Sequence, residues 1–449
     1  MESSNDLTRG SITKTLFKLA IPIMGTSFVQ MAYNMIDMIW VGRLGTEAVA
    51  AVGTAGFFTW LGSAFILIPK IGAEVGVAQS VGSNNKKEVD SYIKNSIQIV
   101  ISLAIVYALV LIVFRNGLVG FFNLGDEKII QNTITYLIIV SCGFIFYFIN
   151  PVFTAIFNGY GDSKTPFYIN SAGLVINVIL DPILIFGLGP IPRLAVSGAA
   201  IATVIAQVIV TLLFVIEVKK RREIFADIHL LQKPDMKHIK RIVRLGFPSA
   251  VQSGLFSIIA MVLARIIAHW GSTPIAVQKV GSQIEAISWM TAGGFQTAMS
   301  AFTGQNYGAN KKERVVKGYM VGIAIVSFIG IFATILLYFG AGPLFNIFVQ
   351  EEEAIQLGIQ YLKILAVSQL FMCVEITTAG AFNGLGNTIP PSVVGVLFNA
   401  LRIPAAIWLS STILGLNGIW WAISISSIFK GSVLVIWYII LLKRKWSVQ

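Results

Sequence analysis

Residues 30–42 read QMAYNMIDMIWVG, and they place Asp37 in the middle of an apolar run that extends from Leu16 to Val41. The run is long enough to cross a bilayer, since a transmembrane helix needs about 20 predominantly apolar residues. A charged side chain at the centre of such a helix costs on the order of 2.5–3.5 kcal/mol even on lenient insertion scales. We therefore expect Asp37 to have a function within the membrane that offsets this cost.

The composition of the whole chain is that of a membrane protein. Of its 449 residues, 55% are hydrophobic and 12% are charged, and the mean hydropathy is +0.78. Soluble globular proteins carry about 25% charged residues, so the composition indicates a polytopic membrane protein. The net charge of +12 does not indicate nucleic-acid binding, because the basic residues lie mainly in loops. Cys142 and Cys373 lie within apolar runs and predict no disulfide framework.

The apolar segments predict an all-α polytopic membrane protein with about twelve transmembrane helices. No small-residue cleavage site follows a short apolar core near the N-terminus, so we expect a retained first span and no signal peptide. Segments 48–80 and 275–306 are long and rich in glycine, and we expect them to bend or to extend past the membrane. The predicted spans are residues 16–41, 48–80, 92–114, 130–157, 167–188, 195–217, 246–269, 275–306, 318–340, 357–383, 392–413 and 417–442.

Lys and Arg are concentrated in alternate loops, which predicts the orientation of the chain. Basic loops stay on the cytoplasmic side of a membrane. We therefore expect a multi-pass protein of the plasma membrane (the inner membrane of a bacterial cell), with both termini in the cytoplasm. The basic clusters are at the N-terminus, around 86–94, in the loop 219–244, around 311–317 and at 443–445.

The second half of the chain repeats motifs of the first half at one offset. The paired segments are separated by roughly 222–226 residues. They are NGYGDSKTP (158–166) with NGLGNTIPP (383–391), AQSVGSNNKKE (78–88) with TGQNYGANKKE (303–313), and, more loosely, NVILDPILI (177–185) with NALRIPAAI (399–407).

The repeat predicts two pseudo-symmetric lobes of six helices each. We expect an N-terminal lobe at 1–217, a basic cytoplasmic linker at 218–245 and a C-terminal lobe at 246–449. Each half begins on the same side of the membrane, so the repeats should be parallel. Transporters place their binding sites near the midplane of such repeats.

Polar residues recur on single helix faces within the predicted spans of the first half. Residues three and four apart share a face of a helix, so these side chains should point into the helix bundle. Pro182 directly follows the fifth-span aspartate, and the helix is expected to open there. The residues are Gln30, Tyr33, Asn34 and Asp37 on the first span, Tyr136 and Asn150 on the fourth, Asn177 and Asp181 on the fifth, and Thr203 with Gln207 on the sixth.

Two carboxylates with nearby amide and hydroxyl oxygens fit two kinds of ion coupling. Oxygen ligands bind hard cations, so Asp37, Asn177 and Asp181 are candidate ligands for Na⁺. A carboxyl group in an apolar setting can instead carry a proton. The remaining alternative is that these groups only hydrogen-bond neighbouring helices together. An acid within the membrane is a functional candidate by default, so we favour coupling to H⁺ or Na⁺.

The second half lacks this pattern of acids. Arg402 and Ile403 stand around the position equivalent to Asp181. Glu285 and Glu375 are either secondary sites or members of internal ion pairs with basic residues such as Arg402, Lys430, Arg265, Lys279 or Lys363. We therefore expect ion coupling to belong to the first half.

The ordered series of motifs resembles the multidrug and toxic compound extrusion (MATE) transporters, and among them the bacterial DinF-like branch. The resemblance covers nearly all of the chain. It rests on YNMIDMIWVGRLGTEAVAAVG, NGYGDSKTP, NVILDPILIFG and SGAAIAT in the first half, and on GFPSAVQ, QIEAISWMTAGGFQTAMSAFTGQNYGA and NGLGNT in the second.

The resemblance implies a V-shaped pair of six-helix lobes that face inward and outward in turn. It implies export of organic, often cationic and aromatic, compounds against H⁺ or Na⁺ moving inward. Asp37 would be the central coupling residue, joined by Asn177, Asp181 and Thr203. Phe256 stands near the place of a seventh-span acid found in some relatives, so we expect no coupling site there. A substrate cavity would be lined by Gln30, Tyr33, Asn34, Tyr136, Asn150 and Glu285.

There are three alternatives: a flippase of the same superfamily, an intramembrane enzyme and a passive channel. A flippase for lipid-linked or polysaccharide precursors would favour a cationic cavity, whereas this one is acidic and aromatic. An enzyme is disfavoured, because the chain has neither an HExxH nor a GxSxG motif and only three His. A passive channel is disfavoured by the two pseudo-symmetric halves. We expect a monomer in the lipid bilayer, with small organic cations as partners, no nucleic acid and no cofactor beyond the coupling ion.

Overall fold

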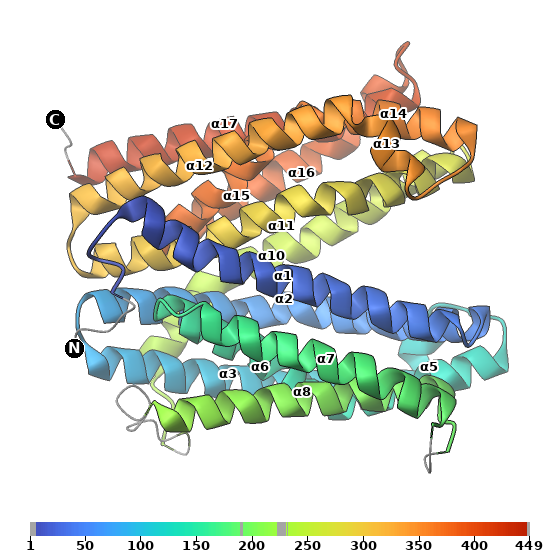
Figure 1. Ribbon diagram of the computed structural model, residues 1–449, viewed down its shortest axis with the longest axis horizontal. Helices are drawn as coiled ribbons and strands as arrows, with labels where there is room; N and C mark the ends of the chain where they lie inside the picture. Colours follow the sequence, from blue (N-terminus) through green and yellow to red (C-terminus); the bar gives the residue numbers. More distant parts are fainter. Residues whose placement is uncertain (1–5, 189–191, 222–229, 231, 447–449) are drawn as a thin grey trace. The chain divides into compact units, whose positions relative to one another are not determined.

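The protein is built from helices, as seen in the computed structural model, which describes residues 6–188, 192–221, 230 and 232–446 (Figure 1). Part of the predicted linker, residues 222–229 and 231, lies outside the described residues. The helices are α1 (Ile12–Gly42), α2 (Thr46–Gly82), α3 (Lys86–Val113), α4 (Arg115–Gly120), α5 (Glu127–Cys142), α6 (Phe144–Gly159), α7 (Lys164–Phe186), α8 (Ala195–Lys220), α10 (Met236–Ala268), α11 (Ser272–Gly308), α12 (Lys312–Phe339), α13 (Ala341–Asn346), α14 (Glu352–Ala366), α15 (Gln369–Gly384), α16 (Ile389–Ser410) and α17 (Leu416–Trp446).

The predicted all-α membrane fold is confirmed. Within the described part of the chain, 9 helices are long and apolar enough to cross a membrane, or up to 11 if each of two bent helix pairs is one span. The remaining long helix, α11, contains 37 residues and coincides with the predicted span 275–306, although it is more polar. At 1.5 Å per residue, α2 and α11 are each about 55 Å long. They therefore extend past a hydrocarbon core that is about 30 Å thick.

Two predicted spans are bent in the structure. The segment 130–157 is divided between α5 and α6, and the segment 357–383 between α14 and α15, and each pair is bent by 50°. The first break lies at Gly143. The apolar run continues through each break, which is why hydropathy alone predicted single straight spans.

The helices pack into two compact units. The first unit consists of Gly25–Ala250, and the second of Met1–Met24 with Val251–Gln449. Two helices therefore begin in one unit and continue in the other. The helix α1 begins in the second unit, and α10 begins in the first.

The internal architecture of the two units supports the sequence repeat. The short helices α4 and α13 each contain 6 residues and follow the long helices α3 and α12. The turns that follow α2 and α11 both hold an asparagine with positive φ, which is 54° at Asn84 and 57° at Asn310. Asparagine is among the few residues that adopt this left-handed conformation at low cost. The same local geometry thus recurs at the repeat spacing.

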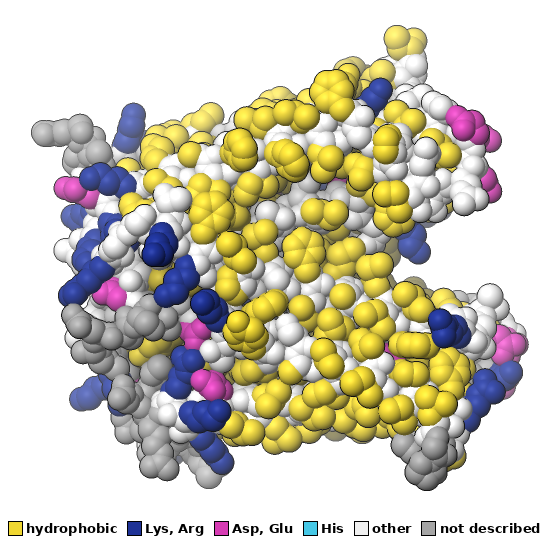
Figure 2. Space-filling model, viewed as in Figure 1, with side chains coloured by type: hydrophobic (Ala, Val, Ile, Leu, Met, Phe, Trp, Pro, Cys, Tyr) yellow, Lys and Arg dark blue, Asp and Glu magenta, His cyan; other side chains and the backbone are white. Residues whose placement is uncertain are grey.

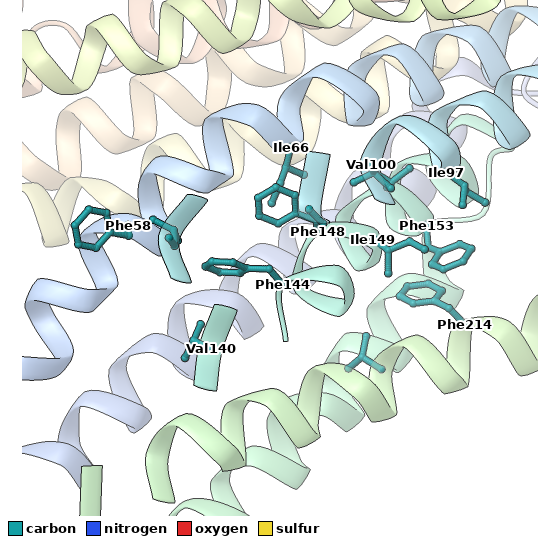
Figure 3. Close-up of a cluster of buried hydrophobic side chains, with 14 of the residues drawn as sticks. Phe58, Ile66, Ile97, Val100, Val140, Phe144, Phe148, Ile149, Phe153 and Phe214 are labelled. Atoms are coloured by element: carbon teal, nitrogen blue, oxygen red, sulfur yellow. The ribbon is translucent and has the colours of Figure 1, made fainter. Parts of the chain in front are cut away.

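The core of the first unit is aromatic and aliphatic (Figure 3). Buried side chains from α2, α6 and α8 meet there, including Phe58, Phe148 and Phe214. The rings of Phe153 and Phe214 stack with centroids 5.4 Å apart. This packing fixes α6 and α8, and α8 carries one of the candidate site residues.

The surface of each unit is apolar along its length and basic at one end. Figure 2 shows hydrophobic side chains over the flanks of the helices, with most of the visible Lys and Arg side chains at one end of each unit. These ends hold the clusters around 86–94 and 311–317 that the sequence analysis singled out.

Candidate functional site

The candidate site lies within the first unit and begins with the polar face of α1. Tyr33 and Asp37 are half-buried, whereas Gln30 and Asn34 on the same helix are exposed. The Oδ1 atom of Asp37 and the hydroxyl of Tyr33 are buried, and neither has a hydrogen-bond partner among the described residues. These two residues therefore bring unsatisfied oxygens into the interior of the unit.

The helix α7 contributes an amide and a second carboxyl group. Asn177 and Asp181 are 0% exposed, and the Asn177 amide donates a hydrogen bond of 3.1 Å to Asp181 Oδ1. Asp181 Oδ2 and Asn177 Oδ1 have no partner within the described chain. The helix is continuous through Pro182 to Phe186, so the opening predicted at this proline does not occur in this structure.

The helix α8 contributes Thr203. Its hydroxyl is buried and makes no hydrogen bond to any residue that the structure describes. The Tyr33 hydroxyl lies near it, but the two do not form a hydrogen bond of normal geometry. Thr203 therefore adds a neutral oxygen to those of α1 and α7.

Carboxyl and hydroxyl groups from five helices, α1, α5, α6, α7 and α8, lie close together at this site. The carboxyl groups of Asp37 and Asp181 lie close enough for their charges to interact. Tyr136 on α5 and Tyr147 on α6 lie within the same range of electrostatic interaction. The site is thus acidic and aromatic.

Five buried oxygen atoms without partners are concentrated in this group. They belong to Tyr33, Asp37, Asn177, Asp181 and Thr203. A buried polar atom that lacks a hydrogen bond costs about 1–3 kcal/mol, and most buried polar groups in proteins are satisfied. A cluster of such atoms is therefore what a site for an exchangeable cation or proton would present.

Asn150 is fully engaged in a contact between two helices. It is 3% exposed, and its amide donates to the backbone oxygen and side-chain oxygen of Gln207 at 3.0 and 2.8 Å. Thr211 donates to Asn150 Oδ1 at 2.7 Å. These bonds join α6 to α8, on which Thr203 lies one turn before Gln207. Asn150 therefore supports the position of Thr203.

Sequence reasoning missed Tyr147 and Thr211. Thr211 continues the four-residue spacing of Thr203 and Gln207, and that spacing could have identified it. Tyr147 precedes Asn150 by three residues, which places both on one side of α6. Because Tyr147 lies in a run of aromatic residues, the sequence did not distinguish it from its neighbours as a site residue.

Glu285 lies in the second unit, on α11. It accepts hydrogen bonds from the Tyr361 hydroxyl at 3.3 Å and the Gln369 amide at 3.0 Å. Arg402 on α16 lies within range of its charge. The second carboxylate of this region, Glu375, forms an ion pair of 3.1 Å with Lys430.

The polar group of the second unit is balanced in charge. Two acids, Glu285 and Glu375, accompany two bases, Arg402 and Lys430, whose charges interact with them. Arg402 is 7% exposed and donates to serine hydroxyls of α17 at 2.6 and 3.0 Å. A buried acid with a basic partner needs no external cation, in contrast to the acids of the first unit.

Comparisons with known proteins agree with this architecture. The MatE family profile matches residues 22–183 and 248–408, one segment in each half of the chain. The probable multidrug resistance protein NorM of Thermotoga maritima is 28% identical over 438 residues, covering 97% of this chain and 93% of that protein. The probable multidrug resistance protein YoeA of Bacillus subtilis is 26% identical over 436 residues, covering 96% and 94%.

The fold matches that of solved membrane transporters. One of them is a MOP superfamily transporter from Pyrococcus furiosus, which shares 25% identity with this chain and has a TM-score of 0.90. The match covers 99% of this chain and 99% of that one. The binding pocket of that transporter is described as having reverse polarity, which suggests a different function for it.

Proposed function

Because this chain belongs to the MatE family of multi-pass membrane transporters, we propose that it exports organic cations in exchange for inward-moving H⁺ or Na⁺. The observation that carries the proposal is the cluster of unpartnered oxygens around Asp37 and Asp181 in the first unit. The names of its relatives, multidrug resistance proteins, support a range of drug-like cargo. We propose further that the chain belongs to the DinF-like branch of the family, which its ordered series of motifs resembles.

The proposed cycle depends on mutually exclusive occupancy of the acidic site. H⁺ or Na⁺ neutralises Asp37 and its neighbours, and the cationic compound then loses its electrostatic attraction to the site. Release of the ion on the other side of the membrane restores the negative charge. A ligand shifts a conformational equilibrium only through its different affinity for the two states, so the charge of Asp37 must differ between them.

In the proposed cycle, the two repeats are the lobes that move. The lobes at 1–217 and 246–449, joined by the linker 218–245, would expose the site to each side of the plasma membrane in turn. Both termini would lie in the cytoplasm, because the loops rich in Lys and Arg are expected to stay on that side of the membrane. We propose that a single chain forms the working transporter, since the unpartnered oxygens of the site all come from one unit.

Export of organic cations is favoured over flipping of anionic lipid precursors. The site of the first unit carries two acids, and aromatic side chains from α5 and α6 lie around them. In the second unit, the buried bases Arg402 and Lys430 are accompanied by Glu285 and Glu375. Neither group has the excess of positive charge that an anionic head group would require.

Transport in reconstituted vesicles tests the function. We expect uptake of a fluorescent aromatic cation, such as ethidium, to be driven by an imposed pH or Na⁺ gradient, with each gradient applied separately. Asp37→Asn should abolish accumulation against the gradient, because an amide cannot exchange a proton and binds Na⁺ weakly. Glu313→Gln is the matched control, since that acid is exposed and pairs only loosely with Lys317 at 3.9 Å.

Two results would contradict the proposal. An Asp37→Asn protein that accumulates the dye at the rate of the unmodified protein would remove Asp37 from coupling. Dye movement that is independent of both gradients would indicate a passive channel.

A further inference from the structure

A histidine joins the beginning of α10 to the beginning of α3 in the first unit. His238 is 6% exposed. Its Nδ1 atom lies 2.6 Å from Asp235 Oδ2, and its Nε2 atom lies 3.0 Å from Glu88 Oε2. Asp235 directly precedes α10, whereas Glu88 lies in the first turn of α3. The ring therefore connects segments that are 150 residues apart in the sequence.

The surroundings of His238 hold its ring in place. The edge of the ring meets the Tyr92 ring, with centroids 5.0 Å apart. Arg241 lies 5.7 Å from the centroid of the Tyr92 ring and donates to Gln79 Oε1 on α2 at 2.9 Å. The backbone N–H of Asp235 donates to the Asn95 side chain on α3 at 2.9 Å. The charged groups at this contact include Glu88, Asp235 and Arg241.

The two contacts of the ring can both be hydrogen bonds to carboxylates only when the ring is protonated. A carboxylate can only accept hydrogen bonds, so both ring nitrogens must donate, and only the protonated imidazole has two N–H groups. The hydrogen bond from His238 holds the pKa of Asp235 below its usual value, so Asp235 stays ionised at neutral pH. Histidine is the side chain that ordinarily changes its charge between pH 5 and 8.

We propose that His238 is a pH-sensitive clamp that holds the start of α10 on α3 while its ring is protonated. When the pH rises and the ring loses a proton, one nitrogen presents a lone pair to a carboxylate, and that contact is lost. The clamped segment leads into α10, which leaves the first unit at Ala250 and continues in the second from Val251. The clamp thus controls the freedom of a helix that connects the two units, whatever compound is transported.

The second unit contains a corresponding contact that lacks a titrating ring. The segment before α1 is held there by Gln305, which accepts from the Leu7 N–H at 3.2 Å. Arg314 donates to the carbonyl oxygens of Arg9 and Gly10 at 2.8 and 2.9 Å. Gln305 is the repeat counterpart of Gln79. These donors and acceptors keep their charge between pH 6 and 8, so this contact is an internal control.

The counterpart of Glu88 in the repeat shows what is specific to the clamp. Glu313 corresponds to Glu88, but its side chain is 91% exposed and lies 3.9 Å from Lys317. The acid is thus common to both units, whereas the partnership with a buried histidine is observed in the first.

Hydrogen exchange of the full chain in lipid nanodiscs tests the clamp. We expect amides of residues 232–246 to exchange about tenfold faster at about pH 8.5 than at about pH 6, after correction for the intrinsic rate, since one hydrogen bond to a charged group is lost. Amides of residues 6–14 should show no such change.

Variants distinguish loss of the His238 contacts from a general increase in hydrogen exchange with pH. In His238→Gln and in Glu88→Gln, the segment 232–246 should exchange rapidly at both pH values, whereas Glu313→Gln should behave like the unmodified protein. The proposal is overturned if the corrected exchange of 232–246 is the same at both pH values in the unmodified protein. It is equally overturned if His238→Gln retains the original pH profile.

Discussion

The acids of the first unit show a conflict between stability and function at the level of single residues. Asp37 Oδ1 and Asp181 Oδ2 are buried without partners in the described chain, and their like charges interact. Both features oppose folding when the two groups are ionised. A bound cation or proton would remove the repulsion and satisfy the free oxygens.

This conflict predicts that removing one of the acids stabilises the fold. Asp181→Asn keeps the size of the side chain and an acceptor for Asn177, but removes one of the two charges. We expect a gain of about 1–2 kcal/mol in unfolding free energy at alkaline pH without Na⁺. The gain should vanish at acid pH, where the carboxyl groups of the unmodified protein are protonated as well. Thermal unfolding in detergent across a pH series measures this difference.

Glu313→Gln, an exposed substitution, controls for the general effect of removing a carboxylate. If Asp181→Asn lowers the stability at every pH, Asp181 has a structural partner in the folded protein and is not held for an ion.

Residue spacing predicted which polar side chains share a helix face, but not which faces meet. The four-residue spacing of Asn177 and Asp181 is seen as a hydrogen bond within α7. The proximity of Asp181 to Asp37 depends on how α7 packs against α1, which periodicity does not contain. For the same reason, the spacing did not predict that the Asn150 side chain forms hydrogen bonds with Gln207 and Thr211.

Among the elements, the motif NGYGDSKTP has a structural explanation. Asp162 caps the beginning of α7 by accepting from the Thr165 backbone N–H at 3.1 Å and the Thr165 hydroxyl at 2.7 Å. Arg221, at the end of α8, forms an ion pair of 2.7 Å with the same carboxylate. The motif thereby ties α7 to α8, the two helices that carry Asn177, Asp181 and Thr203.

Substitutions of Asp162 should separate the cap from the ion pair. Asp162→Asn, the residue found at the repeat position Asn387, keeps a capping oxygen and loses the charge, so we expect a loss of about 1 kcal/mol. Asp162→Ala removes both contacts and should cost about 2–3 kcal/mol. Chemical unfolding of the purified protein measures both values.

Asp126 provides the matched control, because it caps α5 through the Lys128 N–H at 2.7 Å. Asp126→Asn should leave the stability nearly unchanged. Equal effects of Asp162→Asn and Asp162→Ala would show that the capping oxygen contributes nothing.

Hydropathy predicted the existence and approximate limits of the long helices. It did not predict the bends between α5 and α6 and between α14 and α15. Each break is short and lies inside an apolar run, at Gly143 between α5 and α6 and at residues 367–368 between α14 and α15. Since apolar side chains continue on both sides of these breaks, only the packing of the neighbouring helices reveals them.

At the scale of the whole molecule, the basic ends of the units predict a topology that labelling can measure. In a chain with Cys142→Ser and Cys373→Ala, single cysteines at Ser83 and Ala309 should be protected from a membrane-impermeant maleimide added to intact cells. A cysteine at Asn123, in the turn before α5, should react. The reason is that basic loops remain in the cytoplasm.

Permeabilised cells are the control, and all three cysteines should react there. Labelling of Ser83→Cys and Ala309→Cys from opposite sides of the membrane would contradict parallel repeats.

The sequence repeat predicted the internal likeness of the halves but not how their helices are grouped by packing. The motifs recur at a constant offset, and so do α4 with α13 and the turns at Asn84 and Asn310. A repeat defines where each half starts along the chain. It does not show that the beginnings of α1 and α10 contribute to the other unit, because that depends on contacts between distant segments.

The crossing of α1 and α10 has a consequence for biosynthesis. The part of α1 up to Met24 is synthesised before its packing partners, which begin at Val251. This part of α1 therefore cannot complete its packing until the helices from Val251 onward have been synthesised and inserted. Neither half, expressed by itself, would contain all the residues of a complete unit.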